Sequence, residues 1–180
     1  MEIAVMKLAW IAALIGLSAA NGANAQTLEY DCDTQAEHFS VLKAVQQGPS
    51  YKASGSISPR AIFPSKTYAT IGVIDFEPDD KSWRARLGLT ALVIKKREVV
   101  MATLEITRAG KSEEPVMLGS IEDFRMGGTY PISVTLGDSG GTATIGSNTV
   151  PIKLAAQGNI NVSIICSGGE FLFTNLNIGG

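Results

Sequence analysis

The residues best suited to chemistry lie in the stretch GDSGG at residues 137–141. A serine hydroxyl acts as a nucleophile when a histidine accepts its proton and an acid orients that histidine. The chain has one histidine, His38, so a nucleophilic Ser139 would have to use it. A hydrolytic site at Ser139 therefore requires surrounding elements that bring these two side chains together.

The GDSGG stretch matches the block around the nucleophilic serine of trypsin-like proteases, but the rest of the chain argues against that activity. Only residues 26–37 would precede His38 in the mature chain, whereas the double-barrel fold of those proteases needs strands before its histidine. The segments ISVTL and TATI run directly into and out of the block, and Asp, Ser and Gly are typical hairpin-loop residues. We therefore predict a turn between two strands at residues 137–141.

Paired acids offer a second kind of chemistry, because glycoside hydrolysis requires two carboxylates that face each other across the scissile bond. Asp75 and Glu77 are two residues apart and would share one face of a strand. No third acid follows them at a useful distance, and the adjacent Glu122 and Asp123 would point to opposite faces of an extended chain. We predict that the protein is not an enzyme.

Acidic loops are also candidates for a metal site. Asp31 and Asp33 form one group, and Glu77, Asp79 and Asp80 form another, with the oxygen ligands that Ca²⁺ prefers. Neither group follows the DxDxDG pattern of a calcium-binding loop, and exposed acidic turns are the alternative explanation. Zinc needs three or four ligands, which a single histidine does not supply. The sequence predicts no cofactor, with calcium as the alternative, and leaves any metal ligands unknown.

An aromatic side chain beside acids is a candidate for ligand binding. Trp83 follows Asp79 and Asp80 at the entry of a predicted strand, and sugar-binding surfaces use exposed aromatic rings that stack on pyranose rings. One interpretation is a rim formed by Asp79, Asp80 and Trp83 that holds a polar ligand. The alternative is that Trp83 caps the core, because it is in phase with the apolar Leu87 and Leu89.

Strands must position these residues, since most of the chain after residue 48 alternates apolar and polar side chains between turn residues. About ten strands at this spacing predict an all-β fold, either a sandwich or a barrel. Residues 36–45 are less regular and allow either one short helix or a loop followed by a strand. The predicted strands are residues 51–58, 68–77, 83–94, 99–107, 116–121, 130–136, 142–145, 149–154, 159–166 and 170–178.

The N-terminal residues predict export. An uncharged run at residues 8–20 follows Lys7 and leads to Ala23-Asn24-Ala25, which is typical of a secretory signal peptide cleaved after Ala25. The run is short for a bilayer span, which needs ~20 residues, although an uncleaved membrane anchor is the alternative. We expect a signal peptide at residues 1–25 and a single β-sandwich domain at residues 26–180. We expect this domain to be extracytoplasmic, periplasmic or secreted, without a stable membrane span.

The two cysteines, Cys32 and Cys166, support the same compartment. An even number of cysteines in an exported chain predicts one disulfide, whereas two free thiols would need a reducing environment. The bridge would join the two ends of the domain and close a loop of about 134 residues, which the chain-entropy model equates with at most ~5 kcal/mol of stability.

Charge excludes two classes of partner. The formal net charge is −2, which gives no electrostatic reason to expect nucleic acid or an acidic membrane. The basic cluster at residues 95–97 lies between two apolar runs, and we interpret it as a hairpin tip.

The ending CSGGEFLFTNLNIGG is similar to the closing strand of concanavalin A-like lectin/glucanase and LamG-like sandwiches. The segment YPISVTLGDSGGTATIGSNTVPIKL resembles their central hairpins. This resemblance covers residues 51–178 and implies a two-sheet antiparallel jelly roll with adjacent N- and C-termini. It also implies carbohydrate recognition, although the acids of the ExDxxE motif in the glucanases do not map onto this chain.

The sequence therefore predicts an exported, non-catalytic β-sandwich that acts as a binding module, with a glycan or another surface protein as its partner. The alternative is a structural or assembly subunit like those of pili, which have a similar size and one disulfide and pair by donating a strand. The bridge of pilin-type subunits usually closes a short loop, whereas the predicted bridge here spans nearly the whole domain.

Overall fold

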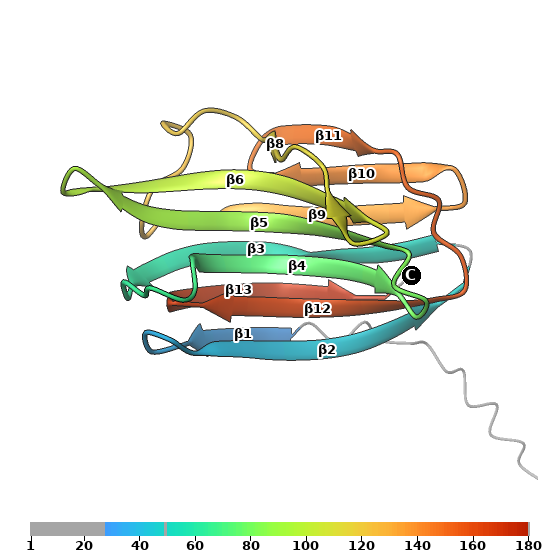
Figure 1. Ribbon diagram of the computed structural model, residues 1–180, viewed down its shortest axis with the longest axis horizontal. Helices are drawn as coiled ribbons and strands as arrows, with labels where there is room; N and C mark the ends of the chain where they lie inside the picture. The colour runs from blue at the N-terminus through green and yellow to red at the C-terminus, as the bar shows by residue number, and fades with distance from the viewer. Residues whose placement is uncertain (1–27, 49, 180) are drawn as a thin grey trace, which may run out of the picture.

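The computed structural model describes residues 28–48 and 50–179, which form two antiparallel sheets stacked face to face (Figure 1). One sheet has six strands in the order β1-β13-β3-β9-β10-β11, and the other has seven, in the order β2-β12-β4-β5-β6-β7 with β8 also paired to β6. The described residues contain no helix, which confirms the predicted all-β sandwich. The strands are β1 (Leu28–Asp33), β2 (Phe39–Gln47), β3 (Ser50–Ile62), β4 (Thr70–Pro78), β5 (Trp83–Ile94), β6 (Arg97–Arg108), β7 (Lys111–Ser112), β8 (Val116–Met117), β9 (Tyr130–Gly137), β10 (Gly140–Ile145), β11 (Asn148–Ile152), β12 (Asn159–Ser167) and β13 (Gly169–Ile178).

The core lies between the sheets and follows from the alternation along each strand. In β12, Ile160, Val162 and Ile164 are fully buried, while the intervening side chains point to the outer face. Phe171 and Phe173 of β13 fill the same layer from the other sheet. Burial of each such large apolar side chain contributes ~1.5–3 kcal/mol, so the sandwich is held together mainly by these inner faces.

The short helix considered for residues 36–45 is wrong, because this segment contributes to the edge strand β2. It pairs with β12 along its whole length, from Phe39 opposite Ser167 to Gln47 opposite Asn159. The helical spacing of Phe39, Leu42 and Val45 is therefore coincidental. In the strand, Phe39 and Val45 are each 60% exposed, whereas Leu42 packs against the core.

The predicted disulfide between Cys32 and Cys166 is present and joins the two sheets at one edge. Cys32 lies in β1 of the six-stranded sheet, and Cys166 lies in β12 of the seven-stranded sheet. Their Cα atoms are 6.3 Å apart, both residues are buried, and the sequence separation is 134 residues. The bridge therefore ties the start of the described chain to its end.

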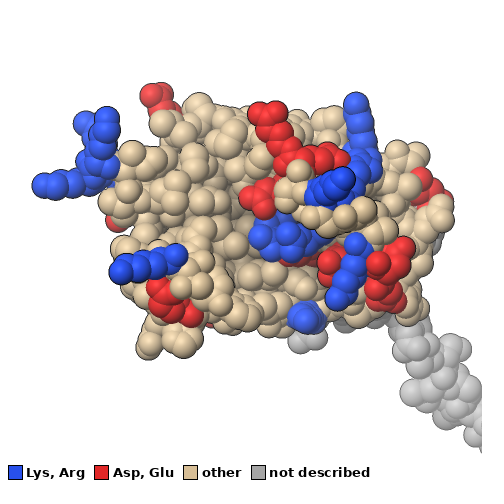
Figure 2. All heavy atoms as spheres, in the orientation of Figure 1, with Lys and Arg blue, Asp and Glu red and all other residues tan. Residues whose placement is uncertain are grey.

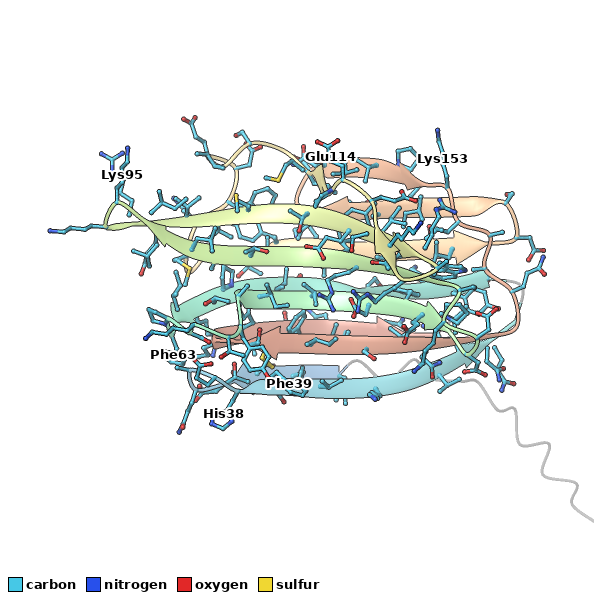
Figure 3. All side chains as sticks on the ribbon, in the orientation of Figure 1. His38, Phe39, Phe63, Lys95, Glu114 and Lys153 are labelled. Carbon is cyan, nitrogen blue, oxygen red and sulfur yellow. A yellow bond between two sulfur atoms is a disulfide. The ribbon has the colours of Figure 1, made fainter. Side chains whose placement is uncertain are left out.

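The GDSGG stretch forms the predicted turn. Asp138 and Ser139 connect β9 to β10 at the right-hand end of the sandwich (Figure 1), whereas His38 lies in the β1–β2 turn at the left (Figure 3). Gly140 has a φ of 122°, and a Cβ on Gly141 would collide with the backbone carbonyl oxygen of Thr135. The glycines thus serve the hairpin, and Ser139 has no histidine to activate it.

The predicted signal peptide at residues 1–25 lies outside the described residues. Within residues 28–48 and 50–179, no helix has the length and apolarity required to cross a bilayer.

Gly141 and Ser139 offer a matched test of the turn. We expect Gly141→Ala to lower the free energy of unfolding by ~1–3 kcal/mol, because the added methyl group overpacks against the β9 backbone. Ser139→Ala should change it by less than ~0.5 kcal/mol, as is usual for exposed positions. Urea unfolding of both variants measures the difference, and equal stability of the two would contradict this account of the glycine.

The disulfide can be tested by replacing both cysteines with alanine. We expect Cys32→Ala combined with Cys166→Ala to lose up to ~5 kcal/mol of stability, because the unfolded chain regains the freedom that the long loop had removed. The urea midpoint of this double variant, compared with that of the oxidised protein, measures the loss. An unchanged midpoint would show that the bridge contributes nothing to stability.

Candidate functional site

Local hydrogen bonds fix the β4–β5 turn. This turn contains Asp79 and Asp80, two of the three predicted ligand-binding residues, and directly precedes the third, Trp83. The backbone N–H of Lys81 donates to the carbonyl of Pro78 at 3.0 Å, and Lys81 has a positive φ of 54°. The backbone N–H of Ser82 donates to Oδ1 of Asp80 at 2.9 Å. This bond lowers the pKa of Asp80 and keeps its carboxylate charged to more acidic pH than usual.

Asp79 is held by two amides from a distant part of the chain. Nδ2 of Asn159 donates to one carboxylate oxygen at 3.0 Å, and Nδ2 of Asn161 donates to the other at 2.9 Å. Both asparagines lie in β12, next to β4, and their two-residue spacing places both amides on the side of Asp79. Sequence reasoning missed them because only the β4–β12 register brings them to the turn.

Asp79, Asp80 and Asn159 border a depression of about 400 Å³ beside the β4–β5 turn, which lies at the right-hand end of the sandwich in Figure 1. We call it the Trp83 depression, and it contains all three predicted ligand-binding residues. Trp83 is half-buried: it packs against the core, as the alternative interpretation expected, and it also lines the depression. Its role in ligand binding stays a prediction. The lining residues are Pro78, Asp79, Asp80, Ser82, Trp83, Ala155, Gln157 and Asn159.

The far wall of the Trp83 depression, residues 153–158, lacks regular structure but is anchored at several points. The Tyr51 hydroxyl donates to the carbonyl of Gly158 at 2.6 Å, and the N–H of Ala156 donates to the carbonyl of Gly137 at 3.0 Å. Arg108 donates to the carbonyl of Lys153 at 2.8 Å. Burial raises the pKa of Tyr51, so its hydroxyl remains a donor. The wall therefore presents Ala155 and Gln157 in a fixed arrangement.

The paired acids of β4 have different surroundings. Asp75 is 6% exposed although it belongs to the outer face, and Nε and Nη2 of Arg86 donate to its two oxygens at 2.7 and 2.9 Å. This bond raises the pKa of Arg86, whose Nη1 is also 4.0 Å from Glu105. Both carboxylate oxygens of Asp75 accept hydrogen bonds from Arg86. Asp75 and Glu77 are therefore not two equivalent acids available for hydrolysis.

The acids considered for calcium are dispersed. Within the described residues, no group of three or more His, Cys, Asp or Glu side chains converges in the manner of a metal site. Asp31 pairs with Arg60 at 3.4 Å, and Asp79 is held by amides, as described above. The prediction of no cofactor, with calcium as the alternative, is not decided by this dispersal and stays a prediction.

A second aromatic feature, which sequence reasoning did not single out, lies at the opposite end of the sandwich. The rings of Phe39 and Tyr68 meet edge to face with centroids 5.9 Å apart, and both are exposed. The depression that Tyr68 lines has no carboxylate among its lining residues, in contrast to the amide-held Asp79 of the Trp83 depression. This pair therefore provides a comparison surface for the Trp83 depression.

Comparison with solved structures places the fold among sugar-binding and sugar-cleaving sandwiches. The chain is similar to the carbohydrate-binding module CBM66 from Bacillus subtilis, with 8% identity over 87% of this chain and 91% of that chain and a TM-score of 0.56. It is also similar to galectin LEC-6 from Caenorhabditis elegans, with 10% identity over 84% of this chain and 96% of that chain and a TM-score of 0.53. An alginate lyase from Pseudomonas aeruginosa gives 14% identity, 72% and 64% coverage and a TM-score of 0.50.

These similarities confirm the concanavalin A-like jelly roll as the fold. No protein-family model and no curated protein sequence matches the chain. Identities this low show a shared fold alone, and one fold supports unrelated functions, so the activity must be argued from the site.

The Asp75–Arg86 pair generates a stability prediction. We expect Arg86→Ala to lower the free energy of unfolding by ~3–5 kcal/mol, because it leaves a buried carboxylate without its partner. The control is Arg84→Ala, because Arg84 lies two residues away on the same face and has no ion pair among the described residues. It should lower the free energy of unfolding by less than ~0.5 kcal/mol. Thermal unfolding at neutral pH compares the two, and similar losses would show that the ion pair is not specifically important.

Proposed function

We propose that this protein is an exported, non-catalytic binding module that holds a saccharide in the Trp83 depression. The observation that supports this most directly is a half-buried indole beside a carboxylate whose two oxygens are fixed by amides. A sugar ring has an apolar C–H face and a rim of hydroxyls, so it needs an aromatic surface and fixed polar groups at the same place. The Trp83 depression offers both.

Each polar group of the depression has a role in this proposal. Asp79 and Asp80 accept hydrogen bonds from sugar hydroxyls, and such charge-assisted bonds are stronger than neutral ones. Gln157 and Ser82 each donate and accept, which suits hydroxyls that do both. Because neighbouring hydrogen bonds already orient Asp79 and Asp80, little side-chain freedom is lost on binding.

The fold supports carbohydrate binding in general, since a carbohydrate-binding module and a galectin share it. An alginate lyase shares it too, so the non-catalytic assignment rests on the site. The titratable groups that line the Trp83 depression are Asp79 and Asp80; amides of β12 hold Asp79, and a backbone N–H of the turn holds Asp80. We propose that binding needs no metal ion and that the disulfide reflects an extracytoplasmic location.

A second candidate, the assembly subunit, is favoured by an apolar groove of about 280 Å³ at the edge of β1 and β2. Leu28, Leu42, Leu176 and Ile178 line it, and such a groove is the kind of surface that a donated strand covers. Size-exclusion chromatography at several protein concentrations distinguishes the two functions, because an assembly subunit forms oligomers as its concentration rises.

Substitutions of Trp83 test the proposed site. We expect Trp83→Leu to weaken glycan binding about tenfold or more, because loss of the aromatic contact costs ~1.4 kcal/mol or more. Trp83→Phe keeps an aromatic surface and should bind within a few-fold of the original protein. A glycan array identifies a ligand, and titration calorimetry then measures both variants with and without a chelator.

The matched control is Phe39→Leu, which removes an exposed ring at the other end of the sandwich. We expect it to leave glycan binding unchanged, and we expect the chelator to have no effect. Binding that survives Trp83→Leu but is lost in Phe39→Leu would move the site to the opposite end. An array without any bound glycan would contradict the proposed function itself.

A further inference from the structure

A second depression, of about 360 Å³, lies on the other side of the β4–β5 turn. We call it the Arg84 depression. Trp83 borders both depressions, so they adjoin at this residue. The lining residues are Glu77, Lys81, Trp83, Arg84, Thr107, Gly110 and Ser112.

The alternation of β5 explains why neighbouring residues serve different depressions. Trp83 is in phase with the buried Ala85 and faces the interior, whereas Arg84 belongs to the outer face and is paired with Thr107 of β6. The Arg84 depression therefore belongs to the outer face of the seven-stranded sheet, and the Trp83 depression to its end. Charged side chains gather over the middle and the right-hand part of this face, while the area to the left of the middle is largely uncharged (Figure 2).

The two cations of the Arg84 depression differ from Arg86 and Arg108, two nearby arginines of the same sheet. Arg86 is bound to Asp75, and Arg108 is bound to Glu113. Among the ion pairs of the described residues, none includes Lys81 or Arg84. The depression contains two cations and one carboxylate, that of Glu77, so its formal charge is positive.

The two depressions thus have opposite charge. The Trp83 depression carries Asp79 and Asp80, which repel an anionic group, whereas Lys81 and Arg84 attract one. A guanidinium matches the planar arrangement of carboxylate or sulfate oxygens with two parallel hydrogen bonds. A ligand that fits both depressions is therefore uncharged on one side of Trp83 and anionic on the other.

We propose that the Arg84 depression is an anion subsite, and that the ligand is an acidic oligosaccharide with a neutral sugar unit next to a unit bearing a carboxylate or sulfate. This inference rests on the proposed function and deepens it, because the Trp83 depression holds the neutral unit. Arg84 and Lys81 bind the anionic oxygens, Thr107 and Ser112 supply hydroxyls, and Glu77 opposes the ligand charge.

Three oligosaccharide probes test the inference by titration calorimetry. A chitin tetrasaccharide is neutral, a hyaluronan tetrasaccharide alternates neutral units with carboxylate-bearing units, and a keratan sulfate tetrasaccharide carries sulfate without carboxylate. We expect one or both acidic probes to bind at least tenfold more tightly than the neutral probe. The preference should shrink as salt is raised from 50 mM to 500 mM, because salt screens exposed charges.

Charge-removing variants then locate the effect. We expect Arg84→Gln to lower the affinity for the acidic probe about tenfold and to leave the affinity for the neutral probe unchanged. Glu77→Gln should raise the affinity for the acidic probe, because it removes the one carboxylate among the residues that line the depression. The control is Lys96→Gln, which removes an equal charge at the distant β5–β6 tip and should change neither affinity. Unchanged thermal unfolding verifies that each variant is folded.

The failures of the two proposals are distinguishable. If the neutral and acidic probes bind equally and Arg84→Gln has no effect, the anion subsite is wrong while the saccharide site stands. If acidic binding is weakened equally by Arg84→Gln and Lys96→Gln, the attraction is non-specific and the subsite is again wrong. If none of the probes and no glycan on the array binds, the proposed function fails, and the subsite fails with it.

Discussion

The structure depends on the burial of one apolar face of each sheet against the other. Residues such as Ile164 and Phe171 meet in this layer from opposite sheets, and no helix covers either outer face among the described residues. The outer faces therefore carry charged side chains such as Asp75 and Arg86, which pair within their own sheet, beside exposed apolar side chains such as Phe39. The Cys32–Cys166 bridge joins the two sheets at one edge and restricts how far they can separate.

This arrangement also explains where a binding site can form. Strand alternation assigns each residue to the core or to an outer face, but at a strand end the opposite sheet no longer covers the inner side. Trp83 stands at such an end, so its ring packs against the core and still borders a depression. The irregular wall at residues 153–158 completes the depression because Tyr51, Gly137 and Arg108 anchor it through hydrogen bonds.

The charges of the outer face are divided between structural and unpaired groups. Arg86 and Asp75 neutralise each other in a nearly buried pair, which accounts for a charged residue where the pattern of β4 is otherwise mostly buried. Arg84, two residues away, has no such partner among the described ion pairs and borders the positively charged depression. The same residue type thus stabilises the sheet at one position and has no ion-pair partner among the described residues at the other.

The sequence by itself determined the all-β class, the strand β5 at residues 83–94 and the turn at residues 137–141, because local alternation and turn chemistry are properties of neighbouring residues. It also predicted the disulfide, because the chain has two cysteines and they can pair only with each other. It also placed Asp79 and Asp80 in one turn, with Trp83 shortly after them at the start of a strand. It did not determine that Asn159 and Asn161 hold Asp79, that Asp75 is bound to Arg86, or that residues 36–45 contribute to a strand rather than a helix. Only the tertiary structure decided these, because each depends on which strands become neighbours and in which register. Asp79 and its two asparagines, for example, are about 80 residues apart in the chain and carry no local sign of their contact.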